Sequence, residues 1–319
     1  MRLWTVLEAL SSTRPRTGFT RRKHYWNFFW RSAGDMKHHR IGFYLLLIFP
    51  LLVGLDQADA SAFRVKISPR VIKPGDAFFV KVNGVKGRRK PSAVFSGKGL
   101  PLENCGKGCF IAVGAAEIGK RPGSFTVKVR KGRSKGTVKL RVKDFVFPET
   151  NLTLPDEQVL LNNEQLAVVN EEKEKLLSLF GNISRRQWNG GFILPLKNDI
   201  STRFGTKRIM NEEWVSVHHG VDIVGEEGEE VLASNCGSVV LAEDLFFGGN
   251  TVIIDHGQGI YTIYMHLSDF NVGVEEVVSK GDVIGFVGSS GRSLGPHLHF
   301  GVKVLNVSVD PLSLIKLKL

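Results

Sequence analysis

Apolar and polar residues alternate with a period of two through the first half of the chain, and this pattern predicts β-strands. The clearest runs are "FRVKISP", "AFFVKVNG", "SFTVKVRKG" and "GTVKLRVKDF". Gly, Pro and Lys-Gly turns separate these runs at short intervals. Such spacing predicts a small all-β sandwich, with an immunoglobulin-like arrangement, over residues 61–147.

The hydrophobic period then changes. The segment "LPDEQVLLNNEQLAVVNEEKEKLLSLFGN", residues 154–182, has acidic residues at its start, apolar residues three and four apart, and a Gly at its end. This pattern predicts one or two helices. Residues 148–189 are therefore interpreted as a helical linker.

Strand patterns return from residue 190, now with many glycines, in "VSVHHGVDIV", "GSVVLAED", "NTVIIDHG", "GIYTIYMHL" and "PHLHFGVKV". The sequence "DHGQGIY" is typical of a tight hairpin turn between two strands. This stretch contains no amphipathic pattern of helix length. Residues 190–319 are therefore expected to form a second β-rich domain, which makes the whole chain mainly β.

A short apolar run, "IGFYLLLIFPLLVGL" at residues 41–55, lies near the start of the chain. It is shorter than the span of about 20 residues that a membrane helix needs. The basic "MKHHR" precedes it and "ADA" follows, so residues 36–60 are predicted to be a secretory signal peptide. Export to the periplasm, the cell envelope or the medium follows from this interpretation.

Residues 1–35 fit poorly in front of a signal peptide, which indicates that translation starts at Met36. In that case residues 1–35 are a non-native extension. If the longer start is genuine, this Arg-rich extension stays cytoplasmic and residues 41–55 act as a single-span anchor. A membrane association is expected only if this segment is retained.

Charge is divided unevenly along the chain. Residues 61–144 carry a net charge of +17, whereas residues 145–319 carry −10. The basic residues occupy outward positions of the predicted strands, where they form either a solvated face or a surface that binds an anionic polymer. No aromatic stacking pattern interleaves these charges, and the protein is predicted to be exported, so nucleic acid is not the expected partner. Anionic polymers of the bacterial envelope are the better candidates.

Three cysteines are too few for a disulfide-rich scaffold. Cys105 and Cys109, in "CGKGC", would close a tight loop in an oxidising compartment. Cys236 is expected to be a small buried apolar residue.

Histidine and aspartate residues recur at even spacing in three of the C-terminal strand patterns. They are His218 and Asp222 in "HHGVD", His266 in "YMHL", and His297 and His299 in "PHLHF". Even spacing places side chains on one face of a strand, and by the same rule His266 should share a face with Tyr264. Leu298 and Phe300 then point into the core. Four imidazoles and one carboxylate can therefore converge.

Such a cluster has a chemical use. Two His and one Asp can hold Zn²⁺ and leave a fourth position for water, as catalytic zinc sites do. Two further His residues could then move the proton and stabilise an oxyanion. The helical H-E-x-x-H motif of other metalloproteases is absent from the sequence.

The chain also resembles a known family, the lysostaphin/LytM-type zinc metallopeptidases, over residues 190–313. The resemblance is carried by "RFGTKR", "HHGVDI", "VLASNCGSVV", "GGNTVIIDHGQG", "YMHL", "VSKGDVIGFVGSSGRSLGPHLHF" and "VDPL". It implies an antiparallel LytM-like sheet with a duplicated hybrid motif, one Zn²⁺ per chain, and hydrolysis of peptide bonds in peptidoglycan stem peptides or cross-bridges. The site residues that it implies are His218, Asp222 and His299 for the metal, His266 and His297 for catalysis, and Arg203 and Asn250 near the substrate groove.

Other interpretations explain less. Some relatives lack the ligands and activate other wall hydrolases, so a non-catalytic regulator is the alternative function, but this chain keeps all five positions. A biotinyl or lipoyl carrier domain is excluded because no modifiable Lys lies at the hairpin tip. The loop "GSSGRSLG" lacks the G-K-[ST] ending of a phosphate-binding loop.

His219 is interpreted as a neighbour of the site, and His256 as a turn residue. The bond that is cut, and which of His266 and His297 is the base, are left open by the sequence.

Overall fold

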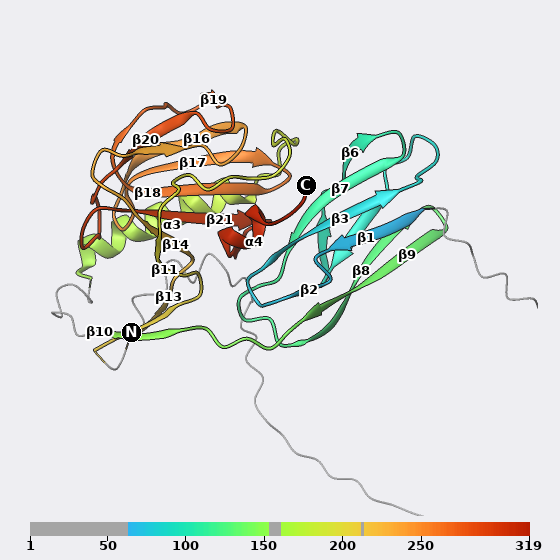
Figure 1. Cartoon of the computed structure of the whole chain (residues 1–319), viewed down its shortest axis with the longest axis horizontal. Helices are drawn as coiled ribbons and strands as arrows, with labels where there is room; N and C mark the ends of the chain where they lie inside the picture. The colour runs from blue at the N-terminus through green and yellow to red at the C-terminus, as the bar shows by residue number, and fades with distance from the viewer. Residues whose placement is uncertain (1–62, 153–160, 212–213) are drawn as a thin grey trace, which may run out of the picture. The chain divides into compact units, whose positions relative to one another are not determined.

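The computed structural model describes residues 63–152, 161–211 and 214–319 (Figure 1). All of these residues belong to one compact unit. The predicted signal segment and the N-terminal extension lie outside the described residues. Within the described ranges, no helix is both long enough and apolar enough to cross a membrane.

The first part of the structure consists of two small sheets, as the period-two pattern predicts. Their strand orders are β1-β3-β7-β6 and β2-β9-β8-β4-β5, and β2 and β9 pair in parallel. The strands are β1 Arg64–Ser68, β2 Val71–Ile72, β3 Ala77–Asn83, β4 Ser92–Phe95, β5 Lys98–Leu100, β6 Glu103–Gly106, β7 Cys109–Ala115, β8 Gly123–Lys131 and β9 Ser134–Val142. Inward residues such as Phe78, Val127 and Leu140 form a shared core.

Cys105 and Cys109 form a disulfide across the β6–β7 turn. Cys236 is a free thiol and is only partly buried, whereas the sequence suggested a buried residue. The difference arises because Cys236 lies in the irregular segment just before a strand rather than on an inward strand position.

The segment after the first two sheets contains a strand as well as a helix. Strand β10, Glu149–Leu152, pairs in parallel with β12, Lys207–Met210, which pairs with β13, Trp214–Val217. Helix α3 runs from Asn163 to Gly181. Asn162 caps its first turn in a reciprocal capping box with Gln165, which explains why the helix begins there.

Helix α3 packs on the C-terminal sheet (Figure 1). Leu176 and Phe180 pack in one cluster with Leu241, Ile253 and Tyr261, which are strand residues of that sheet. Burial of this apolar stripe stabilises the helix more than its intrinsic propensity does. The predicted linker therefore becomes part of the C-terminal core.

The C-terminal sheet is antiparallel, with the main strand order β11-β14-β21-β18-β17-β16-β19, and β15, β20 and β22 pair along it. The strands are β11 Ile200–Thr202, β14 Gly220–Val224, β15 Glu230–Leu232, β16 Gly237–Leu245, β17 Gly249–Gly257, β18 Ile260–Phe270, β19 Val277–Val278, β20 Val283–Val287, β21 His297–Val304 and β22 Val307–Val309. A short helix that the sequence pattern did not predict, α4 Pro311–Ile315, follows with Asp310 as its N-cap.

Register within this sheet positions the residues of interest. Asp222 on β14 lies directly opposite His299 on β21. The neighbours of His299, Leu298 and Phe300, are fully buried, as predicted, and Phe300 packs 5.4 Å from Tyr264 between ring centroids. The side chain of His299 therefore emerges from the face of the sheet opposite to the core.

The hairpin between β17 and β18 has the predicted tight turn. Its two loop residues, Gln258 and Gly259, have φ angles of 56° and 72°. Positive φ at both positions is typical of a type I′ turn, whose twist matches the flanking strands.

Candidate metal centre and catalytic site

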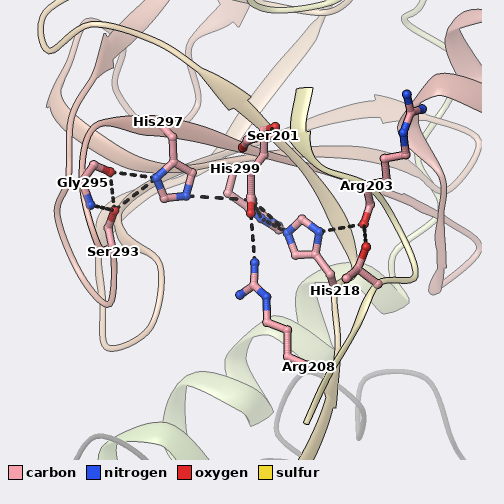
Figure 2. Close-up of polar contacts among 10 residues, drawn as sticks. Ser201, Arg203, Arg208, His218, Ser293, Gly295, His297 and His299 are labelled. Atoms are coloured by element: carbon pink, nitrogen blue, oxygen red, sulfur yellow. Dashed lines mark hydrogen bonds and ion pairs between the residues drawn. The ribbon is translucent and has the colours of Figure 1, made fainter. Parts of the chain in front are cut away.

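Two side chains from neighbouring strands and one from the segment just before β14 meet at one point. Asp222 Oδ1 lies 2.8 Å from His218 Nε2 and 2.9 Å from His299 Nδ1. The two imidazole nitrogens are 3.0 Å apart. Figure 2 shows His218 and His299 turned toward one another in this cluster. The register of β14 and β21 accounts for the Asp222–His299 pair, and His218 joins it from just before β14.

The orientation of His218 is fixed by the backbone. Its Nδ1 lies 3.1 Å from the carbonyl oxygen of Arg203. A carbonyl oxygen only accepts hydrogen bonds, so Nδ1 carries a proton, and Nε2 is the atom that would ligate a metal ion. Metal-binding histidines are commonly oriented in this way by a second hydrogen bond.

Gly220 provides the space that the His299 ring occupies. A Cβ atom at this position would lie 2.6 Å from His299 Nε2 and 2.6 Å from the Phe300 carbonyl oxygen. Both distances are too short for a real contact, and the backbone atom cannot move aside cheaply. The Gly in "HHGVD" is therefore required for the two strands to bring their ligands together.

The second oxygen of Asp222 has its own partner. Arg208 Nη2 lies 3.0 Å from Asp222 Oδ2, and Figure 2 shows Arg208 reaching toward the cluster from β12. The Asp222 side chain is only 7% exposed and that of Arg208 is 37% exposed, so this charge-assisted contact is shielded from solvent on the side of the carboxylate. One carboxylate oxygen thus faces the two imidazoles and the other faces a guanidinium.

His266 reaches the site by a different route from the one that the sequence suggested. The prediction that it shares a face with Tyr264 is wrong, because Tyr264 lies opposite Phe300 and is buried in the core. The ladder between β17 and β18 shifts register at this place, and His266 has a φ of 66°. A β-bulge re-aims a side chain in this way, so the bulge turns His266 out of the core face.

His266 and His297 lie beside the three converging groups. Their ring centroids are 4.8 Å apart, and His297 Nε2 lies 3.9 Å from Asp222 Oδ1. His266 Nδ1 contacts the Ser290 carbonyl oxygen at 2.9 Å, and His297 Nδ1 contacts that of Gly295 at 2.8 Å. Both Nδ1 atoms therefore donate, and in the neutral rings both Nε2 atoms keep a free lone pair.

Burial and neighbouring charges set the protonation of the cluster. Burial lowers the pKa of His266 to about 4 and also lowers the pKa of His299. Burial alone would raise the pKa of Asp222, but hydrogen bonds with His218 and His299 outweigh it and hold that pKa well below its ordinary value. The site at neutral pH therefore holds an ionised carboxylate with neutral imidazoles at His266 and His299.

The two histidines assigned no central role lie outside the converging group. His219 is buried with its ring 6.4 Å from that of Phe204, and burial lowers its pKa to about 3. His256 is fully buried, with Nδ1 2.8 Å from the Cys236 carbonyl oxygen and Nε2 2.7 Å from Thr262 Oγ1. Both rings are part of the packed interior, and the interpretation of His256 as a turn residue is wrong, because His256 lies on β17 just before the turn.

Arg203 and Asn250, the two residues expected near the substrate groove, help to position histidines of the site through hydrogen bonds. Arg203 orients His218 through its carbonyl, while its side chain extends away from the cluster in Figure 2. Asn250 ties the start of β17 to β18 and to the loop that contains Ser290, because its backbone N–H donates to Ser290 Oγ and its side chain donates to the Ser268 carbonyl oxygen. Since the Ser290 carbonyl holds His266, Asn250 supports that histidine indirectly.

Sequence reasoning missed three of these contacts. Arg208 was part of the quoted "RFGTKR" but received no role, and the carbonyls of Ser290 and Gly295 carry no side-chain signal. The one sequence signal for Arg208 is its place in that motif, directly after Thr206 and Lys207. Backbone partners of this kind are visible only in the folded chain.

The donor set fits a divalent zinc ion. Within the described residues, His218, Asp222 and His299 form a group whose ligand atoms all lie within 4.8 Å of one another. Two imidazole nitrogens and one carboxylate oxygen suit Zn²⁺ and leave one tetrahedral position for another ligand. The space at Gly220 and the fixed ring of His218 are the features that adapt the fold to such an ion.

Comparison with known proteins gives consistent matches to one family. Residues 216–311 match the model of Peptidase family M23. The chain is 40% identical over 129 residues to the DD-carboxypeptidase/endopeptidase Mpg of Neisseria meningitidis serogroup B, which is 40% of this chain and 30% of that protein. It is 38% identical over 102 residues to the peptidoglycan DD-endopeptidase ShyA of Vibrio cholerae, which is 32% of this chain and 24% of that protein. The matches thus span less than a third of these curated relatives.

A solved structure matches more of the chain. It is the crystal structure of a candidate M23 peptidase from Pseudomonas aeruginosa, with a TM-score of 0.59 and 26% sequence identity. The match covers 76% of this chain and 94% of that one. It therefore extends well beyond the region that contains the converging histidines.

Proposed function

We propose that this chain, whose residues 216–311 match the model of Peptidase family M23, is an exported zinc-dependent endopeptidase that hydrolyses peptide bonds in peptidoglycan. The observation that carries the proposal is the convergence of His218, Asp222 and His299 on one point, with His266 and His297 beside them. The relative ShyA of Vibrio cholerae, which is named a peptidoglycan DD-endopeptidase, supports the same substrate.

The metal would be held by His218 Nε2, Asp222 Oδ1 and His299 Nδ1. Zinc in such a site lowers the pKa of a water molecule and polarises the carbonyl of the scissile bond. Arg208 holds the other oxygen of Asp222, so that the carboxylate offers a single oxygen to the ion. One ion per chain is expected from this donor set.

His266 and His297 would carry the proton through the reaction. Each ring donates from Nδ1 to a carbonyl and keeps Nε2 free in the neutral form. A neutral Nε2 would accept the proton of the attacking water, and the ring protonated at Nε2 would then donate to the oxyanion or the leaving amine. The two histidines share these roles in the proposal.

The substrate is proposed to be the stem peptides or cross-bridges of peptidoglycan. The two relatives carry the names DD-carboxypeptidase/endopeptidase and DD-endopeptidase, which favour cross-links between D-amino acids over glycine bridges. The predicted signal segment at residues 36–60 supports a location in the periplasm, in the cell envelope or outside the cell.

Digestion of purified peptidoglycan tests this function. The zinc-loaded full chain is incubated with peptidoglycan of each cross-link type, and the fragments are identified by mass spectrometry. The proposal expects cleavage of one cross-link type, and loss of cleavage in the His299→Ala variant. A wild-type chain that binds no metal and cleaves neither substrate would contradict the proposal and favour a regulator of other hydrolases.

A further inference from the structure

The outward face of strands β8 and β9 carries an unusual charge pattern. Its five cations are Lys128, Arg130, Lys135, Lys139 and Arg141, all of them exposed. The alternate residues of the same strands, such as Val127, Val129, Leu140 and Val142, point inward and are buried. This face, called here the β8–β9 face, contains no acidic side chain. The two strands lie side by side in Figure 1.

The arrangement of these cations is costly to the isolated domain. Arg130 and Lys135 lie directly opposite each other in the antiparallel ladder. Like charges at such positions are destabilising, because their Cβ atoms are only about 5 Å apart. None of the five cations forms an ion pair within the described part of the chain, whereas the nearby Lys90 and Lys98 pair with Glu103 and Glu117. An external anion would relieve this repulsion.

The remaining residues of the face indicate what kind of anion fits. Ser124, Thr126 and Thr137 lie among the cations and offer hydroxyl groups. The neighbouring strands β2 and β4 each add one exposed apolar side chain, Val71 (52% exposed) and Val94 (38% exposed). The β8–β9 face itself has no aromatic residue. Insertion into lipid calls for larger apolar side chains, and single-stranded nucleic acid calls for aromatic stacking. A hydrated polymer with repeated carboxylates suits the face better.

We propose that the β8–β9 face binds the peptidoglycan polymer itself, through the free carboxylates of its stem peptides. This inference rests on the proposed function, because it takes the substrate polymer as the partner. On β9, Lys135 and Arg141 are six residues apart, or about 20 Å along an extended strand, so several stem peptides can be contacted together. A second attachment point raises the effective concentration of substrate at the catalytic site.

Matched charge-neutralising variants of the full chain test the proposal. In the face variant, all five cations of the β8–β9 face are replaced by Gln. In the control variant, five exposed cations outside this face are replaced by Gln: Lys86, Arg88, Arg89, Lys107 and Arg121. Both variants lose the same net charge. Co-sedimentation with insoluble peptidoglycan is measured at low and at moderate salt, together with hydrolysis of a soluble cross-linked muropeptide.

The face variant should bind insoluble peptidoglycan about tenfold or more weakly than the wild type, with kcat/KM on the soluble muropeptide unchanged. The control variant should bind like the wild type, and amidation of the peptidoglycan carboxyls should abolish the difference. Equal binding by the two variants would overturn the proposal, as would face-dependent binding to phosphatidylglycerol vesicles without binding to peptidoglycan. If the wild type does not cleave the muropeptide, the proposed function fails, while sedimentation still reports on the face.

Discussion

Arg208 Nη2 contacts Asp222 Oδ2 at 3.0 Å, on the side of the carboxylate away from the oxygen that meets His218 and His299. The guanidinium therefore fixes the plane of the carboxylate as well as compensating its charge. Arg208 comes from β12, which belongs to a different sheet from the β14 and β21 strands. Two sheets thus meet at one side chain of the proposed metal site.

Replacement of Arg208 by Gln should weaken zinc binding by about 10- to 100-fold, as loss of an outer partner of a metal ligand generally does. The expected cause is rotation of the Asp222 carboxylate away from its ligating geometry. Competition with a chromophoric chelator measures the zinc dissociation constant. Lys207→Gln is the matched control, because Lys207 lies on the same strand but pairs with Glu149. An unchanged zinc affinity in Arg208→Gln would remove the positioning role.

His266→Ala and His297→Ala should each keep one zinc per chain and lose about 10²- to 10⁴-fold in kcat, which is the usual contribution of a general acid or base. Both rings lie beside the three converging ligand atoms rather than among them. Metal analysis combined with muropeptide kinetics separates the two effects. A stoichiometric loss of zinc in either variant would place that histidine among the ligands instead.

Gly220→Ala should both destabilise the fold and weaken zinc binding. The added Cβ would lie 2.6 Å from His299 Nε2 and from a backbone oxygen, so the two strands must separate. Overpacking of this kind costs about 1–3 kcal/mol in the free energy of unfolding. Gly273→Ala is the control, since a Cβ there meets nothing within 4 Å. Urea unfolding and zinc titration of both variants give the comparison, and equal behaviour of the two would contradict the prediction.

Stability should depend on pH through His256. Burial lowers its pKa from 6.5 to about 4 in the folded chain. Between these values the unfolded chain binds a proton that the folded chain excludes, so stability is complete above pH 6.5 and falls as the pH drops toward 4. The loss attributable to this group approaches about 3 kcal/mol at the acidic end.

The His256→Gln variant isolates that contribution. Urea unfolding of chelator-treated wild type and variant is measured from pH 8 to pH 4.5. The variant should lose less stability than the wild type on acidification, because Gln does not titrate. Parallel curves for the two proteins would show that His256 does not contribute to the acid lability.

The alternation of buried and outward side chains along a single strand could be predicted from the sequence. The side chains whose direction depends on that alternation could therefore be predicted too. Leu298 and Phe300 are buried as expected, so His297 and His299 emerge together on the other face. The Gln258–Gly259 turn and the switch from strands to a helix were also accessible, because each depends on local residue preferences. These features involve neighbours in the sequence.

Long-range contacts and irregular backbone could not be predicted. The face of His266 depends on a bulge in β18 that breaks the period of two, and the prediction based on that period was wrong. The Arg208–Asp222 contact joins two sheets, and the pairing of β10 with β12 joins segments far apart in the chain. Neither leaves a periodic signal. The tautomers of the histidines depend on loop carbonyls, which every residue possesses.

X-ray absorption at the zinc K-edge of the zinc-loaded full chain tests the central claim most directly. Coordination by His218, Asp222, His299 and one further light atom predicts about four N or O neighbours at about 2.0–2.1 Å, with the outer-shell scattering of two imidazoles. The Asp222→Ala chain should lose this spectrum together with the bound zinc. A sulfur neighbour at about 2.3 Å, or a zinc shell that survives unchanged in Asp222→Ala, would contradict the assignment of these three ligands.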